Sequence, residues 1–211
     1  AVLAIKDDWT NAIQKYKRAI ELKPNDALFR ANYARALLKS GQEEESIKQL
    51  ELAYQLNPKD KVILSALAGK CIEAGNFENA ITLLEQGAFL FPNSAQLHDK
   101  LSYVFAKAGN LNQSIAHARE AIKLDPKLVS AKMNLGSALL TKGNVEEAKE
   151  VYQETAALEP NNPDAHYLLA TTFEKLGNKT AAKQELTTFL GLARENDPRL
   201  PKVKEKLETL R

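Results

Sequence analysis

Three kinds of side chain in this sequence are of types that carry out chemistry: histidine, cysteine and clustered carboxylates. The histidines, His98, His117 and His166, are far apart along the chain, which gives no sign of a shared metal site. Cys71 is the only cysteine, so neither an intrachain disulfide nor a cysteine pair for zinc can form. The glutamates at 43–45 are typical of a solvated helix start. We therefore expect no metal and no cofactor.

The sequence also lacks the short motifs that organise nucleophilic or nucleotide chemistry. No serine or cysteine stands in a nucleophile-elbow context, and no glycine-rich run resembles a phosphate-binding loop. The net charge of +2 gives no reason to expect nucleic acid as a partner. No apolar run approaches the roughly 18 residues that span a bilayer, so direct membrane insertion is not expected. We expect no catalytic residues, and any function should lie on a surface.

A strict period organises the elements that would form such a surface. Five glycines recur at intervals of 34 residues: Gly41, Gly75, Gly109, Gly143 and Gly177. Five prolines keep the same interval: Pro24, Pro58, Pro92, Pro126 and Pro160. A fixed period of this length predicts an array of stacked repeats, in which each unit buries its apolar face against its neighbours.

Each period contains the pattern of two helices. Eight residues before each glycine stands a large apolar residue, followed by a small one that lets a second helix approach: Tyr33-Ala34, Leu67-Ala68, Leu101-Ser102, Leu135-Gly136 and Leu169-Ala170. The glycine then ends the first helix. Asparagine follows four of the glycines and is a favoured N-cap, so a second helix should begin at once. The pattern predicts antiparallel helical hairpins.

These residues resemble the signature of the tetratricopeptide repeat family. The signature is a large apolar residue, a small one, glycine, another small residue and then proline, within 34 residues. It is clearest at Leu135-Gly136, Gly143, Ala148, Leu158 and Pro160, and nearly as clear at Leu67-Ala68, Gly75, Phe77, Ala80 and Pro92. The resemblance implies an all-α fold, a right-handed superhelical solenoid of stacked antiparallel helix pairs with a C-terminal capping helix.

The glycine register predicts the domain organisation. It gives a partial repeat at 1–26, five repeats at 27–60, 61–94, 95–128, 129–162 and 163–196, and a capping helix at 197–211. In the partial repeat, Trp9 aligns with core positions of a second helix and Leu3 with a first helix that is cut short. We expect either a longer parent protein, which the pattern favours, or a short first helix that acts as a cap. At a position aligned with Leu37 and Phe105, Cys71 is expected to be a small core residue.

The last repeat departs from the pattern. Arg194 stands where a proline is expected, so its second helix should continue to about Asn196. Beyond Pro198, apolar residues fall on one side of a further helix with a polar outer face, as a terminal cap requires: Leu200, Val203, Leu207 and Leu210. The mixed charges of this helix argue against a membrane-surface role.

The resemblance implies that the remaining face of each first helix lines a concave groove for a protein or peptide partner. The candidate partner-binding residues on this face are Asn32, Arg35, Lys39, Lys100, Tyr103, Lys107, Met133, Asn134 and Tyr167. The chaperone adaptors of the family bind a C-terminal carboxylate through set basic and asparagine positions, and no window of this sequence reproduces that set. The asparagine ladder of members attached to sugar-transferring enzymes is also broken, because only Asn32 and Asn134 occupy it.

We therefore expect a non-catalytic scaffold that binds a peptide or protein in its groove as part of a multiprotein assembly. One alternative is a targeting or substrate-recruiting domain of a larger enzyme, for example a glycosyltransferase, with its catalytic part outside this sequence. A second is a self-assembling scaffold. The sequence leaves open the partner, the oligomeric state and the compartment, with cytoplasm and periplasm both compatible.

Overall fold

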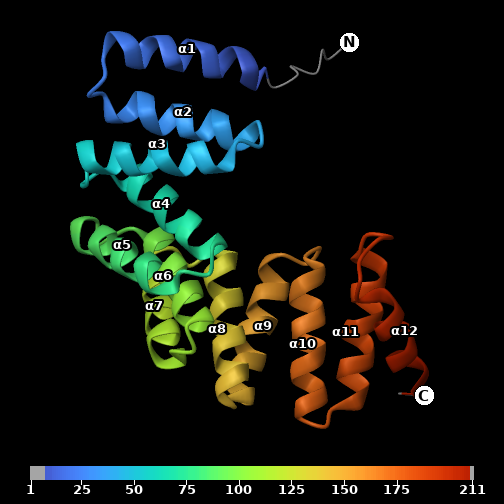
Figure 1. The fold of residues 1–211 in the computed structure, drawn as a ribbon. Coiled ribbons are helices and arrows are strands. Elements are labelled where there is room, and N and C mark those ends of the chain that lie inside the picture. Colours follow the sequence, from blue (N-terminus) through green and yellow to red (C-terminus); the bar gives the residue numbers. More distant parts are fainter. Residues whose placement is uncertain (1–7, 210–211) are drawn as a thin grey trace. The chain divides into compact units, whose positions relative to one another are not determined.

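A computed structural model describes residues 8–209 of the chain, and all regular secondary structure in that range is helical (Figure 1). The residues fall into two compact units, unit 1 within residues 1–92 and unit 2 within residues 93–211. The described helices of unit 1 are α1 (Trp9–Leu22), α2 (Ala27–Lys39), α3 (Glu43–Leu56), α4 (Lys61–Glu73) and α5 (Phe77–Leu90). Those of unit 2 are α6 (Ala95–Lys107), α7 (Leu111–Leu124), α8 (Val129–Lys142), α9 (Val145–Leu158), α10 (Pro163–Lys175), α11 (Lys179–Leu192) and α12 (Leu200–Thr209).

The periodic glycines form the turns inside the helix pairs, as predicted. All five have positive φ, from 73° at Gly75 to 93° at Gly143, a region in which glycine avoids the steric cost of a Cβ. The N-cap predicted after the glycine is also confirmed at three sites. The side chains of Asn76, Asn110 and Asn178 each accept a hydrogen bond from the backbone N–H three residues on. The two helices of a pair are therefore joined by very short connections.

Asn144 occupies the N-cap position of α9 but makes no capping hydrogen bond with its side chain. The N-cap expected from the asparagine at this position is therefore not completed by a side-chain bond. The carboxylate of Glu147, three residues on, pairs with the guanidinium of Arg119 on the preceding second helix, α7.

The small residues at the helix crossings are buried, and their polar atoms have partners. Ser46 is fully buried on α3, and its hydroxyl donates to the carbonyl oxygen of Ala34 on α2 at 2.7 Å. In α6 and α7 the hydroxyls of Ser102 and Ser114 lie 3.4 Å apart, also fully buried. The small positions therefore allow close helix approach without leaving a buried hydroxyl unsatisfied.

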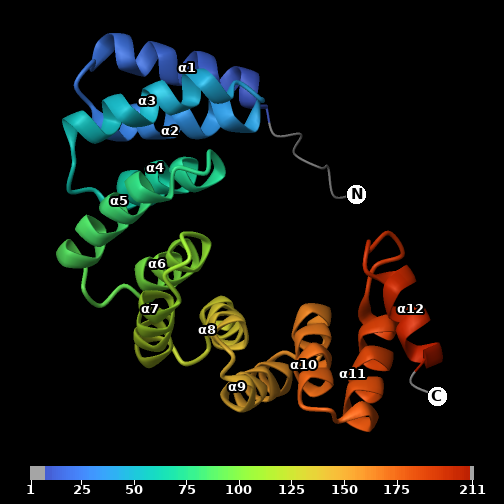
Figure 2. The ribbon, with the colours of Figure 1, turned by 60° about the horizontal axis from the view of Figure 1, so that its bottom comes forward.

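The apolar core of unit 2 continues from one helix pair to the next. Leu135, Leu139 and Tyr152 lie in one buried cluster with residues of α7 and α10. Phe189 and Val203 lie in a second cluster, formed by α10, α11 and α12. Figure 2 shows α12 lying beside α11, as it also does in Figure 1. The predicted C-terminal helix is therefore present, and it covers the last pair. Of its predicted apolar residues, Leu210 lies outside the described range, as does Leu3 at the other end.

The predicted end of the last second helix is wrong. α11 ends at Leu192 rather than near Asn196, and Ala193 already has extended backbone, with φ −67° and ψ 143°. The chain then turns, and the N–H of Asp197 donates to the carbonyl of Arg194 at 2.9 Å. A longer α11 would leave no residues for the turn that brings Leu200 and Val203 of α12 back onto the cluster with Phe189.

Two single residues bear on the core predictions. Trp9 is partly buried and packs against the cluster that contains Ile13 and Leu37, as expected for a core position of α1. Cys71 is only partly buried, so its assignment to the core is only partly correct. Burial, and then the charge of Glu51, raise the pKa of the Cys71 thiol.

None of the helices within residues 8–209 is long and apolar enough to cross a membrane.

Candidate functional site

In unit 1 three of the candidate partner-binding residues lie on α2. Arg35 and Lys39 are exposed, and Asn32 is half-buried one turn before Arg35. α2 contains no acidic residue. The side chain of Glu73, the only acidic residue of α4, pairs with Lys70. This face of α2 therefore presents positive charge that no carboxylate of its own helix offsets.

In unit 2 a second group of candidates lies along α6. The Tyr103 side chain is 40% exposed, and the Nζ of Lys107 lies 5.4 Å from the centroid of its ring. A lysine over an aromatic face is a cation–π contact, which holds both groups near one spot on the surface. One turn earlier, burial lowers the pKa of Lys100, while the charge of Asp99 acts in the opposite direction. The three candidates therefore form a stripe of two cations and an aromatic ring.

Asp99 connects α6 to the candidates on α8. Its Oδ1 accepts from the Nδ2 of Asn134 at 2.8 Å, and its Oδ2 accepts from the hydroxyl of Ser130 at 2.7 Å. The structure thus brings Asn134 against α6, with part of its hydrogen-bonding capacity already used. Met133 is partly buried and packs against the core cluster around Leu135. Asp99 is the residue that joins two first helices, a role that sequence reasoning did not identify.

Tyr167, the candidate on α10, takes part in holding α12. Its ring lies 5.3 Å from the ring of Phe189, and the guanidinium of Arg199 lies 5.0 Å from the Tyr167 ring. Arg199 also pairs with Asp164 at 2.7 Å and with Asp197 at 2.6 Å. On the same helix Glu174 pairs with Lys206 of α12 at 2.6 Å. This face of α10 is therefore partly occupied by Arg199, just before α12, and by Lys206 on α12. Tyr167 is in contact with the C-terminal part of the chain, unlike Tyr103.

Two of the histidines meet, which their separation in the sequence did not suggest. The Nδ1 atoms of His98 on α6 and His117 on α7 lie 3.0 Å apart, and the His117 ring stacks on Phe105 with an interplanar angle of 3°. The third, His166, contacts Glu185 and the carbonyl of Pro160 instead. Within residues 8–209 no group of three or more histidine, cysteine or acidic residues could hold a metal ion. The contact between His98 and His117 could have been predicted from the sequence, because the two residues belong to the two helices of one pair.

This histidine pair predicts that unit 2 becomes less stable in mild acid. Burial, and then the neighbouring His98, lower the pKa of His117 in the folded state. Since the unfolded pKa is about 6.5, the unfolded chain binds more protons below that pH, and stability falls as the pH drops through the window beneath it. Urea midpoints of the wild type and of His117→Gln, measured at about pH 7.5 and pH 5, should show a smaller loss for the variant. An equal loss of stability in the wild type and the variant would exclude the histidine pair as the cause of the acid sensitivity.

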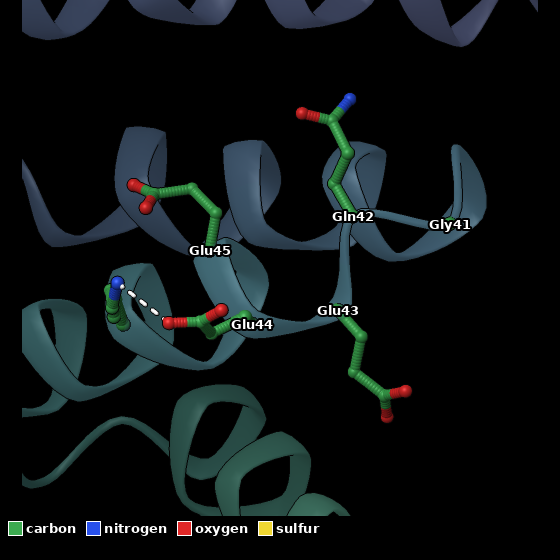
Figure 3. Close-up of a pocket in the computed structure, with 6 residues that line it drawn as sticks. Gly41, Gln42, Glu43, Glu44 and Glu45 are labelled. Carbon is green, nitrogen blue, oxygen red and sulfur yellow. Dashed lines mark ion pairs between the residues drawn. The ribbon is translucent and has the colours of Figure 1, made fainter.

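The acidic start of α3 forms an open hollow rather than a cation site. Figure 3 shows the carboxylates of Glu43, Glu44 and Glu45 pointing in different directions around it. The Nζ of Lys48 pairs with Glu44 at 3.1 Å. Glu43 pairs with Lys70 at 3.2 Å. Because the carboxylates diverge and two of them are already paired, they do not converge on a shared point as cation ligands must. The sequence interpretation of a solvated helix start agrees with this geometry.

Comparison with known sequence families gives two matches. The family of the cilia and flagella-associated protein 70 middle TPR-like domain matches residues 64–190. The tetratricopeptide repeat family matches residues 3–53. No curated protein matches this chain in sequence.

Solved structures that resemble this chain show the same fold. YrrB, described as a TPR protein with an unusual peptide-binding site, is 19% identical with a TM-score of 0.72, over 92% of this chain and 100% of its own. A chain of the APC/C hetero-tetramer Cut9-Hcn1 is 17% identical with a TM-score of 0.76, over 96% of this chain but 39% of its own. MamA from Desulfovibrio magneticus RS-1 is 20% identical with a TM-score of 0.73, over 82% of this chain and 97% of its own. Identities this low show a shared fold and leave the partner open.

Proposed function

This chain belongs to the tetratricopeptide repeat proteins, in the family of the cilia and flagella-associated protein 70 middle TPR-like domain, and we propose that it is a non-catalytic scaffold that binds a protein or peptide on its first-helix faces. Tetratricopeptide repeat domains are in general protein-interaction modules. We propose repeat boundaries at 27–60, 61–94, 95–128, 129–162 and 163–196, which follow the glycine register.

One observation carries the proposal. Side chains that the core does not use stand exposed on the first helices of both units, and they are of types that dominate protein interfaces. Arg35 is exposed on α2, and Tyr103 is 40% exposed on α6 beside Lys107. Tyrosine and arginine are enriched among the residues whose truncation weakens binding most. The peptide-binding site named for YrrB, a protein of the same fold, supports the same use of the fold here.

The faces differ in what they can offer a partner. On α8 and α10 several hydroxyls are already bonded within the fold: Ser137 to Tyr152, Thr141 to the carbonyl of Ser137, and Thr171 to the carbonyl of Tyr167. Arg35 and Tyr103 are exposed side chains to which we assign no comparable hydrogen bond within the fold. We therefore propose that they are available to a binding partner. We propose that they are the principal contacts, one on each unit.

A double variant tests this function. Arg35→Ala with Tyr103→Ala should weaken capture of the native partner by about tenfold or more, because each removes a contact of a type that costs over 1 kcal/mol at interfaces. The control is Lys183→Ala with Leu158→Ala, which removes one positive charge and one large, partly exposed side chain from second helices; Leu158 is also 40% exposed. The measurement is quantitative affinity capture from a cell extract, with circular dichroism to show that both variants remain folded. Equal losses in both variants would refute the proposed face.

Sedimentation over a concentration series separates the scaffold from a self-assembling one. If the wild type associates with itself and the double variant does not, the proposed face binds a second copy rather than a different partner.

A further inference from the structure

The first helices of unit 2 share a feature at their C-terminal ends. α6, α8 and α10 each end on a lysine: Lys107, Lys142 and Lys175. All three side chains are exposed. We call these three residues the lysine edge. It runs along the turns at which each first helix of unit 2 passes into its second helix. In unit 1, α2 also ends on a lysine, Lys39, but α4 ends on Glu73, so the two first helices there do not share the feature.

The acidic residues beside the lysine edge are already neutralised by other cations. In the first turn of α9, Glu146 pairs with Lys149 and Glu147 pairs with Arg119. In the last turn of α10, Glu174 pairs with Lys206 of α12 at 2.6 Å. The first turns of α7 and α11 contain no acidic residue. Each carboxylate in these turns therefore has its own partner.

The lysines themselves have no such partner. Among the residues that the structure describes, no ion pair involves Lys107, Lys142 or Lys175, although Lys107 contacts the Tyr103 ring. A lysine in the last turn of a helix offsets the negative end of the helix dipole by a few tenths of a kcal/mol. The helix dipole is a reason for a lysine at the end of each helix. It does not explain why the carboxylates nearby pair with other cations instead of with these lysines. The result is a row of three lysines that form no ion pair with any residue between 8 and 209.

We propose that the lysine edge binds an acidic segment of the protein partner. This inference rests on the proposed function, and it adds the chemistry of the partner. Neighbouring helix axes lie about 8–10 Å apart, so Lys107 and Lys175 should be about 16–20 Å apart across α8. An extended chain covers that distance with about five or six residues. A short acidic peptide in extended form can therefore reach all three ammonium groups.

A labelled peptide of defined charge provides the test. The probe is a fluorescein-labelled peptide of twelve residues in which glutamate and serine alternate, and its control has lysine in place of glutamate. Fluorescence anisotropy at low salt should show binding of the acidic peptide alone. Lys107→Gln with Lys142→Gln and Lys175→Gln should weaken that binding by about tenfold, because three exposed ion pairs of ordinary strength are lost.

A matched triple variant separates this edge from the overall charge of the chain. Lys127→Gln with Lys183→Gln and Lys204→Gln removes the same charge from exposed positions elsewhere in unit 2 and should leave peptide binding nearly unchanged. Equal weakening by the two triples, or no binding of the acidic peptide by the wild type, would overturn the proposal. An oligothymidylate of twelve nucleotides bound as tightly as the peptide would also overturn it, in favour of a general polyanion surface.

The two proposals fail in different ways. If the acidic peptide does not bind but Arg35→Ala with Tyr103→Ala still abolishes partner capture, the scaffold function stands and the acidic partner does not. The triple variant is expected to fold, since each change removes at most the small contribution of a lysine at a helix end.

Discussion

Phe189→Ala is expected to lower the free energy of unfolding of unit 2 by about 3–5 kcal/mol, the cost of removing a fully buried aromatic side chain. Phe189 has no exposed surface, and it packs with Ala170, Leu186 and Val203 from three different helices. The guanidinium of Arg199 lies 4.8 Å from the centroid of its ring. Truncation therefore leaves a cavity where α10, α11 and α12 meet, and α12 loses the surface on which it rests.

The same substitution at Phe89 is the matched control. The Phe89 side chain is 85% exposed on α5, so Phe89→Ala should change stability by no more than about 0.5 kcal/mol. Urea unfolding followed by circular dichroism gives the free energies, and hydrogen exchange shows where protection is lost. We expect loss of protection in α10–α12 for Phe189→Ala alone. A cost below about 1 kcal/mol for Phe189→Ala would mean that the C-terminal helices do not pack as described.

α12 is held by charge as well as by this apolar contact. Arg199 donates to the carboxylate of Asp197 through both Nε and Nη2, and these bonds lower the pKa of Asp197 to about 2. Since the folded pKa lies below the unfolded one, the contribution of Asp197 is present above about pH 4 and is lost only as the pH falls through about 2. The contribution of Asp197 is thus insensitive to the mildly acidic range in which His117 responds.

The sequence predicted the features that repeat within one helix pair. Gly109 and Asn110 show why: the turn needs a residue with positive φ and the next helix needs an N-cap, and both demands fall on adjacent positions. The small residue at Ser102 similarly follows from the close approach of α7. Such demands are local, recur every 34 residues and leave a visible pattern.

Contacts between pairs left no such pattern. The bonds from Ser130 and Asn134 to Asp99 join two first helices, and no other pair of first helices in unit 2 has the same three residues. The end of α11 was missed for a related reason, because it depends on where α12 packs rather than on the residues near Arg194. For the candidate site, the sequence predicted that Tyr103 and Lys107 of α6 lie outside the core, and both are exposed. It could not predict that Tyr167 on α10 would contact Arg199, the residue just before α12.

Gly136→Ala is expected to destabilise unit 2 by about 1–3 kcal/mol, although alanine is the better helix former. A Cβ at this position would lie 2.6 Å from both Cε1 and Cζ of Tyr152. The Tyr152 ring cannot easily move, because it is fully buried and its hydroxyl lies 3.0 Å from that of Ser137. Burial also raises the pKa of Tyr152 to about 12, as expected for a phenol held inside the core.

Gly69→Ala is the opposite case and serves as the control. Gly69 lies inside α4, and a Cβ there would meet nothing within 4 Å. The substitution should therefore stabilise unit 1 by up to about 1 kcal/mol, the helix propensity difference alone. Thermal unfolding followed by circular dichroism should show shifts of opposite sign for the two variants, of about 2–4 °C for each kcal/mol in a chain of this length.

The repeats themselves explain why Gly136 cannot tolerate a methyl group. The five small crossing positions are Ala34, Ala68, Ser102, Gly136 and Ala170, and the facing positions on the second helices are Leu50, Leu84, Ala118, Tyr152 and Leu186. Among the five crossing positions, glycine occurs only where the facing residue is tyrosine. The smallest residue at a crossing position therefore accommodates the largest facing side chain. Gly136→Ala with Tyr152→Leu should therefore recover stability that Gly136→Ala loses, since it gives the alanine–leucine combination found in three of the other four repeats. If the double variant is no more stable than Gly136→Ala alone, steric contact with Tyr152 is not the cause of the loss.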